Sequence, residues 1–206
     1  NVAVLHDVRA YAEAIELHAL VRDLCEHTHA VSVTLRREAN TAGAEDVLAW
    51  QTGYPAAVSF ARDHGLLLGI KGGGHNIAGT AIAEGGLTLD LSGMREVAAD
   101  PDAKVVHVGP GCLLGEVDEA TQAHGLATVL GFVSETGVAG LTLGGGFGYL
   151  ARRFGWTVDN LVEVEVVCAD GRIRTANRDQ HPELFWALRG GGGNFGVVTR
   201  FSLQLH

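Results

Sequence analysis

The chain has 206 residues, of which 47% are hydrophobic and 19% are charged, so it can build one sizeable core or two small subdomains. Its formal net charge of −9 excludes a broad basic surface for nucleic acid or an anionic membrane, and no apolar run reaches the roughly 18 residues that span a bilayer. The three cysteines are far apart and form neither a disulfide framework nor a paired metal motif, so we expect a reducing, cytoplasmic setting.

The first part of the chain is predicted to be α/β. A helix is expected over 7–25 and a short strand over 30–35. Pro55 is expected to open a separate helix that ends at Gly65, because proline is costly inside a helix but fits its first turn. The apolar run 66–70 then predicts a strand buried on both faces, and a glycine loop follows it.

The rest of the chain is predicted to consist of strands with two or three helices between them. The pattern of apolar residues predicts strands over 87–91, 104–108, 161–168, 172–175 and 197–205. Helices are expected over 113–124 and 182–189, and residues 169–171 (ADG) are typical of a hairpin turn. The sequence therefore predicts an α+β fold in two subdomains.

Glycine is the compositional outlier, with 29 residues, about twice its usual share. The glycines cluster at 72–74, 144–148 and 190–193, each time beside apolar, strand-like segments rather than in a linker. Consecutive glycine N–H groups can converge on an anion, because no Cβ atoms block the approach. Lys71 is the only fixed cation in the first of these loops, so a bound diphosphate would depend mainly on main-chain donors. The alternative is that the glycines only form tight turns.

The familiar phosphate motifs do not explain these glycines. The G-x-G-x-x-G match at Gly191, Gly193 and Gly196 follows a predicted helix and precedes a strand, which reverses the order in a dinucleotide-binding turn. Lys71 is followed by glycine rather than by serine or threonine, so a P-loop is excluded as well.

Three long segments carry a family resemblance: 70–79 (IKGGGHNIAG), 134–148 (SETGVAGLTLGGGFG) and 185–199 (FWALRGGGGNFGVVT), with 156–161 (WTVDNL) between the last two. In order and spacing they resemble the PCMH-type FAD-binding domain of FAD-linked oxidases, in the berberine-bridge-enzyme-like branch of the vanillyl-alcohol-oxidase superfamily. The resemblance implies a small βαβ subdomain plus a larger antiparallel sheet flanked by helices. It covers about residues 56–206 and leaves 1–55 as an atypical N-terminal segment, because residues 50–55 would interrupt a helix that runs unbroken in relatives.

The resemblance also implies that FAD is the cofactor and that the glycine-rich segments hold it. The loop that contains the first glycine run, from Lys71 to His75 with Asn76 and Gly79, would bind the diphosphate. The middle segment would line the rest of the cofactor, and the last segment would contact the adenine or ribose end through its backbone. The implied cofactor-binding residues are Lys71, Gly72, Gly73, Gly74, His75, Asn76, Gly79, Thr136, Gly137, Gly140, Gly144, Gly145, Gly146, Gly196, Val197 and Val198.

His75 occupies the position at which this family joins a histidine ring nitrogen to the flavin 8α-methyl group, so the resemblance implies one covalent bond to FAD. Without the motif, a histidine in a glycine loop would more simply cap a turn. The cysteine that forms a second bond in some relatives is absent from residues 131–134 (GFVS), and Cys112 and Cys168 are expected to be small buried residues.

The implied function is that of an FAD-dependent oxidase, in which a substrate C–H bond delivers a hydride to flavin N5 and O2 reoxidises the flavin. The implied partner is a small-molecule substrate, without nucleic acid or membrane. The catalytic base of relatives usually comes from a following substrate domain that this sequence lacks. We therefore name no catalytic residue and expect a fragment or a truncated paralogue. Two alternatives stay open: a non-catalytic flavin- or partner-binding module, and a non-covalent FAD reductase of the same superfamily.

Other groups of reactive side chains receive structural interpretations. Glu163 and Glu165 alternate with valines, so they are expected to form a solvated strand face rather than a catalytic pair. No metal is expected, because the reactive side chains near the N-terminus match no standard ligand spacing: His18, Cys25, His27 and His29.

Overall fold

The computed structural model describes residues 2–6, 30–34 and 44–206, with side chains from residue 53 onward. The expected helix over 7–25 and the group His18, Cys25, His27 and His29 lie outside the described residues. The chain divides into two compact units. Unit 1 takes in Asn1–Lys71, Asn76–Gly93 and Val167–Ile173, and unit 2 takes in Gly72–His75, Met94–Val166 and Arg174–His206. Among the described residues, no helix has the length and apolar character needed to cross a membrane.

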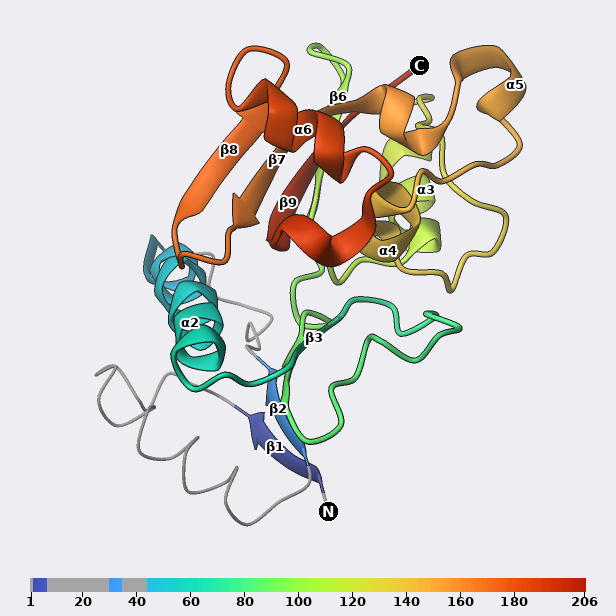
Figure 1. Cartoon of the computed structure of the whole chain (residues 1–206). Coiled ribbons are helices and arrows are strands. Elements are labelled where there is room, and N and C mark those ends of the chain that lie inside the picture. The colour runs from blue at the N-terminus through green and yellow to red at the C-terminus, as the bar shows by residue number, and fades with distance from the viewer. Residues whose placement is uncertain (1, 7–29, 35–43) are drawn as a thin grey trace. The chain divides into compact units, whose positions relative to one another are not determined.

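Unit 1 contains a four-stranded parallel sheet in the order β1-β2-β4-β3 (Figure 1). Its strands are β1 (Val2–His6), β2 (Ala30–Thr34), β3 (Leu68–Lys71) and β4 (Leu87–Asp90). The sequence predicted all of these except β1. The expectation that the strand after residue 66 is buried on both faces is wrong, because β3 lies at the edge of the sheet and is only partly buried. The fully buried strand is β4, which has neighbours on both sides and buries Leu87, Thr88 and Leu89.

Helix α2 (Ala44–Asp63) runs through Pro55 without a break, so the expected helix start at Pro55 is wrong. A proline in a helix interior loses one backbone hydrogen bond and costs about 3 kcal/mol. The helix nevertheless continues because one buried face extends across the proline, and each large apolar side chain buried there contributes about 1.5–3 kcal/mol. The buried residues of this face have the i, i+3, i+4, i+7 spacing of a helix: Tyr54, Ala57, Val58 and Ala61.

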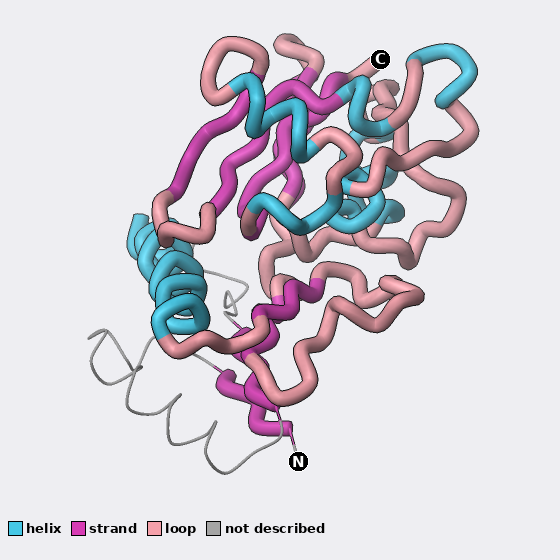
Figure 2. Tube along the Cα trace, in the orientation of Figure 1, coloured by secondary structure: helices cyan, strands magenta, loops and turns pink. Residues whose placement is uncertain are grey.

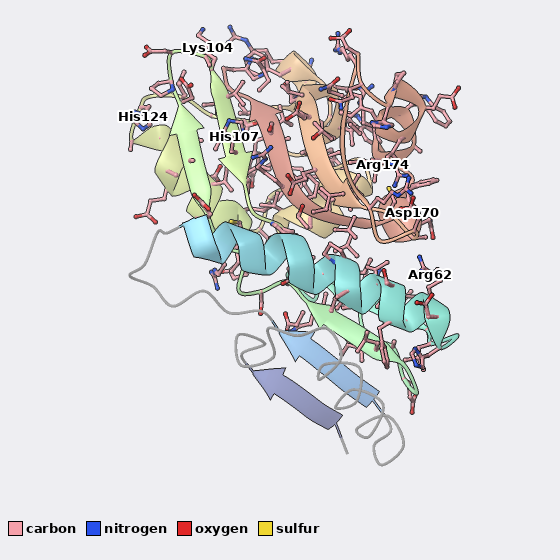
Figure 3. All side chains as sticks on the ribbon, turned by 90° about the vertical axis from the view of Figure 1, so that its left-hand side faces the viewer. Arg62, Lys104, His107, His124, Asp170 and Arg174 are labelled. Atoms are coloured by element: carbon pink, nitrogen blue, oxygen red, sulfur yellow. The ribbon has the colours of Figure 1, made fainter. Side chains whose placement is uncertain are left out.

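The turn between β7 (Leu161–Val167) and β8 (Ile173–Asn177) belongs to unit 1 and packs against α2. Arg62, which Figure 3 labels near the end of α2, donates from its guanidinium to the carbonyl oxygen of Ala169 at 3.1 Å. Gly171 has a φ of +75° and lies so close to Ser59 that a Cβ would clash with the serine hydroxyl. The predicted hairpin is therefore confirmed, and it packs against the C-terminal part of α2.

Unit 2 is built on a five-stranded sheet in the order β5-β6-β9-β7-β8. Besides β7 and β8 it contains β5 (Val97–Asp100), β6 (Val105–Val108) and β9 (Val197–Gln204). The pairs β5–β6 and β6–β9 are antiparallel. Strand β9, which the sequence predicted over 197–205, is central and buries all its residues except Arg200 and Gln204.

Short helices and 3-10 turns complete unit 2, and long loops connect them (Figure 2). The predicted helices are confirmed as α3 (Leu114–Gln122) and α6 (Pro182–Leu188). The elements that glycine-rich sequence concealed are α4 (Val138–Leu143), α5 (Ala151–Phe154), and the turns η2 (Thr157–Asn160) and η3 (Gly192–Phe195). The predicted α+β fold, with a small parallel unit and a larger sheet, is confirmed.

Candidate functional site

Three glycine segments of unit 2 make up the candidate site: the first segment (72–75), the middle segment (134–148) and the last segment (190–196). The first and middle segments meet backbone to backbone. A Cβ on Gly73 would lie 2.5 Å from both the N and the Cα atom of Gly137. Real Cβ atoms essentially never approach so closely, so only glycine fits at either position.

The first segment presents unpaired hydrogen-bond donors. Among the described residues, none accepts a hydrogen bond from the N–H groups of Gly72, Gly73, Gly74 or His75. Gly72 and Gly73 are half-buried, and backbone N–H groups away from water nearly always have a partner. Consecutive unpaired donors of this kind are typical of an anion-binding loop.

His75 is held by the middle segment. Its Nε2 atom lies 3.0 Å from the carbonyl oxygen of Glu135. Because a carbonyl can only accept, Nε2 carries the hydrogen in the neutral ring and Nδ1 keeps the lone pair. The ring is exposed, and no described residue forms a hydrogen bond to Nδ1. The histidine is thus oriented through one nitrogen and available through the other.

The middle segment is anchored to the residues that precede α3. The Leu114 N–H donates to the Thr136 carbonyl oxygen and the Val138 N–H donates to the Cys112 carbonyl oxygen, each at 2.9 Å. Burial, and to a smaller degree the charge of Glu116, raises the pKa of the Cys112 thiol to about 12. The expectation of a small buried cysteine is confirmed for Cys112, whereas Cys168 is only partly buried.

The glycines of the middle segment fall into two kinds. Gly140 is exposed on α4, and a Cβ there would meet no atom within 4 Å. Gly144 ends α4, and Gly145 and Gly146 then adopt φ values of +112° and +67°. Gly140 therefore faces open space, whereas the later glycines shape the turn that leaves the helix.

The last segment lies beside the middle one, because η3 contacts α4. Gly196 leads from η3 into β9, where the side chains of Val197 and Val198 are buried in the core. Only the backbone of these two valines can face a ligand. The structure therefore brings together the predicted residues of the first, middle and last segments within unit 2.

The predicted site residues Lys71, Asn76 and Gly79 belong to unit 1. The Lys71 ammonium donates to a carboxylate oxygen of Asp90 at 2.9 Å, so its charge is already paired. Burial alone would raise the pKa of Asp90, but the hydrogen bonds from Lys71 and Ser92 lower it below its ordinary value. The side-chain oxygen of Asn76 accepts a hydrogen bond from the Thr80 N–H at 3.2 Å, and its main-chain carbonyl oxygen accepts one from the Gly79 N–H at 3.1 Å.

An exposed aromatic cluster at the middle segment was not predicted from the sequence. Phe132 packs edge to face with Phe147 and Tyr149, at ring distances of 5.5 and 4.8 Å. Trp156 lies 6.0 Å from Phe147, and its ring covers Gly145, where a Cβ would approach it to 3.1 Å. Part of the signal was present in the sequence, since Phe147 lies within the glycine run 144–148 and Tyr149 follows it directly.

The carboxylates of β7 are not a solvated face, which corrects the sequence-based expectation. Both are partly buried and paired: Glu165 accepts a hydrogen bond from the Thr199 hydroxyl at 2.7 Å, and Glu163 accepts one from the Asn177 amide at 2.8 Å. Cross-strand partners therefore satisfy them. Within the part of the chain that the structure describes, no group of three or more His, Cys, Asp or Glu side chains could hold a metal ion.

Comparisons with known proteins agree with this geometry. The FAD-linked oxidoreductase pgmH of Aspergillus terreus is 42% identical over 149 residues, which cover 72% of this chain and 30% of that protein. The solved structure of 6-hydroxy-D-nicotine oxidase from Arthrobacter nicotinovorans aligns with a TM-score of 0.74 at 37% identity, over 76% of this chain and 34% of that one. The BBE-like 1 protein of Physcomitrella patens aligns with a TM-score of 0.72 at 32% identity, over 76% and 35% of the two chains.

The chain thus spans about a third of the length of these proteins. The family model described as an FAD binding domain matches residues 54–177, which include the first and middle glycine segments. The resemblance read from the glycine motifs is confirmed, and the chain belongs to the family of FAD-binding domains found in FAD-linked oxidoreductases.

Proposed function

We propose that this chain provides the FAD-binding part of an FAD-dependent oxidoreductase that acts on a small-molecule substrate. The observation that carries the proposal is the row of unpaired N–H groups at Gly72–His75, set against Gly137, in a domain of an FAD-binding family. FAD carries a diphosphate, and the loop offers it neutral main-chain donors without Cβ atoms in the way.

The residues of unit 2 fit different parts of the cofactor. Gly72, Gly73 and Gly74 would donate to the diphosphate, and Thr136, Gly137 and Gly140 would line the cofactor where α4 leaves open space. The opposite wall of the cofactor site would be formed by Gly144, Gly145 and Gly146. The adenine or ribose would contact the backbone of Gly196, Val197 and Val198. Lys71 would act within unit 1, where its pairing with Asp90 fixes the end of β3, and Asn76 and Gly79 would close the next turn.

His75 would form the single covalent bond to the flavin through Nδ1, in place of one C–H bond of the 8α-methyl group; the two electrons and two protons released would leave with O2 as hydrogen peroxide. The hydrogen bond from Nε2 to the Glu135 carbonyl oxygen leaves the lone pair on Nδ1, which is the nitrogen able to form a bond to carbon. This attachment would keep the cofactor in place whatever its free concentration.

When bound, FAD would supply a hydride acceptor at flavin N5; the substrate would lose a hydride from carbon and a proton from the neighbouring heteroatom, and O2 would take up the two electrons and two protons as hydrogen peroxide. The chain's own contribution is to bind and orient the cofactor. The related 6-hydroxy-D-nicotine oxidase acts on a small molecule, and we propose a substrate of comparable size.

Acid precipitation of the purified chain, after incubation with FAD, tests the proposal. We expect a visible flavin spectrum in the dissolved protein and flavin that stays in the washed acid pellet. The matched variants are His75→Ala, which should bind FAD but lose it on precipitation, and His124→Ala, an exposed histidine that should behave as the parent does.

The alternatives give different results in the same experiment. A yellow solution with a colourless pellet would contradict the covalent bond and favour a non-covalent FAD reductase. A protein that is folded but takes up no FAD would contradict the proposed function and favour a partner-binding module.

A further inference from the structure

The side chain of Arg189 joins the start of the last glycine segment to the turn η2. Its Nε atom donates to the Val158 carbonyl oxygen at 2.7 Å, and its terminal nitrogen donates to a carboxylate oxygen of Asp159 at 3.2 Å. The planar guanidinium makes both bonds with one fixed fork, which a lysine cannot reproduce. Gly190 follows Arg189 directly in the sequence, so η2 holds the point at which the last segment begins.

The turn η2 is in turn bonded to the middle glycine segment. The Thr157 N–H donates to the Gly146 carbonyl oxygen at 2.9 Å, and the Val158 N–H donates to the Gly145 carbonyl oxygen at 3.0 Å. Gly145 and Gly146 both have positive φ, a conformation that other residues rarely adopt. The middle segment is therefore hydrogen-bonded to Val158, and Val158 is hydrogen-bonded to Arg189. The peptide bond from Arg189 to Gly190 then leads into the last segment.

Asp159 provides a second bond between η2 and Arg189. One of its carboxylate oxygens accepts from Arg189, and the other accepts from the Trp156 N–H at 2.8 Å. The neighbouring Asn160 is buried and donates to the carbonyl oxygens of Phe154 and Trp156 at 3.0 and 2.8 Å. The turn is thus held from within, and a change at Arg189 releases the last segment rather than η2 itself.

We propose that Arg189 is a positioning residue for FAD, which sets the last glycine segment in register with the middle one without touching the cofactor. This inference rests on the proposed function. In that proposal the last segment contacts the adenine or ribose end, whereas the first segment and His75 hold the diphosphate and the flavin. Loss of the Arg189 contacts should therefore weaken binding of the adenosine end more than binding of the flavin end.

The test uses the chain with His75→Ala, so that binding is reversible, and measures the Kd for FAD, ADP and riboflavin by calorimetry and flavin fluorescence. Arg189→Gln should raise the Kd for FAD and for ADP by at least about tenfold, equivalent to about 1.4 kcal/mol. Its Kd for riboflavin should stay within about twofold. Arg189→Lys should recover part of the affinity, because an ammonium can reach Val158 or Asp159 but not both in the same fixed geometry.

Two further variants make the result decisive. Arg200→Gln is the matched control, since Arg200 is an exposed arginine of unit 2 whose nearest carboxylate, Glu163, is 3.9 Å away. It should leave all three Kd values unchanged. Asp159→Asn removes the charge and leaves one acceptor oxygen in place of two, so its side chain cannot accept from both Arg189 and the Trp156 N–H. It should weaken FAD binding in the same direction as Arg189→Gln with an intact thermal transition.

An FAD affinity within twofold of the parent in folded Arg189→Gln would overturn the inference. If that variant does not fold, the same result for Asp159→Asn overturns it, and equal weakening of ADP and riboflavin binding contradicts it as well. If the parent itself binds no FAD, the proposed function fails instead, so the two failures are distinguishable.

Discussion

Gly73 and Gly137 lie 64 positions apart in the sequence and meet backbone to backbone, with room for no Cβ on either residue. This contact places the unpaired donors of the first glycine segment beside the start of α4. It also shows that the first and middle glycine segments depend on each other, because each is part of the surface against which the other packs.

Two glycine substitutions should separate folding from cofactor binding. Gly73→Ala places its Cβ 2.5 Å from the Gly137 backbone, and overpacking of this kind costs about 1–3 kcal/mol. Gly140→Ala meets no atom within 4 Å, and alanine favours a helix by about 1 kcal/mol over glycine. We therefore expect urea unfolding to show Gly73→Ala destabilised and Gly140→Ala unchanged or more stable.

FAD titration of Gly140→Ala should show that its affinity for FAD does not follow its stability. Gly140→Ala should bind FAD more weakly than the parent despite its stability, because its methyl group enters the space proposed for the cofactor. Unchanged FAD affinity in Gly140→Ala would remove α4 from the proposed binding surface.

Replacement of Pro55 tests why α2 continues through it. Pro55→Ala restores the missing backbone hydrogen bond and should raise the free energy of unfolding by about 1–3 kcal/mol, less the small entropic advantage that proline gives the folded state. Pro182→Ala is the matched control, because Pro182 occupies the first turn of α6, where proline fits. Equal effects in the two variants would show that Pro55 imposes no cost in this helix.

The Lys71–Asp90 pair predicts a pH dependence of stability. The pKa of Asp90 is lower in the folded chain than in the unfolded chain, so its contribution is present above about pH 4 and is lost as the pH falls through the folded value. Asp90→Asn should therefore be less stable than the parent at pH 6 and should lose less stability between pH 5 and pH 2. Urea unfolding across this range measures both effects.

A double-mutant cycle with Lys71→Met isolates the pair. Because the two groups are bonded at 2.9 Å, the two substitutions should not be additive. Additive effects on the free energy of unfolding would contradict the pairing. So would a loss of stability between pH 5 and pH 2 that is as large in Asp90→Asn as in the parent.

Cys112 should be unreactive in the folded chain. Burial raises the pKa of its thiol to about 12, so almost no thiolate exists at pH 8. Peptide mass spectrometry after iodoacetamide treatment at this pH should show Cys112 unmodified and Cys168, which is only partly buried, modified. Both should react in denaturant, and equal labelling in the folded protein would refute the burial of Cys112.

The sequence predicted the strands other than β1 and β5, because local patterns determine them. The apolar runs of β3 and β6, the turn at 169–171 and Pro182 at the start of α6 all act over a few neighbouring residues. The glycine motifs identified the family for another reason, since a family-specific run can be recognised even where propensity rules predict no regular element.

The errors came from contacts between residues distant in sequence. A proline inside a helix does cost free energy, but at Pro55 the burial of Tyr54, Val58 and Ala61 outweighs that cost. The pairing of Lys71 with Asp90 depends on the register of β3 and β4, which no local pattern reveals. The hydrogen bond from His75 to Glu135 likewise spans 60 positions. A composition rich in glycine concealed the helix α4, which follows Glu135, and the turns after it.

The most direct test of the account is amide hydrogen exchange of the chain with and without FAD. The unpaired N–H groups of Gly72–His75 should exchange rapidly in the free protein and become strongly protected when FAD binds, with matching protection around Gly137 and little change in α3. FAD bound with full stoichiometry and no added protection at residues 72–75 would contradict the claim that these main-chain donors hold the cofactor.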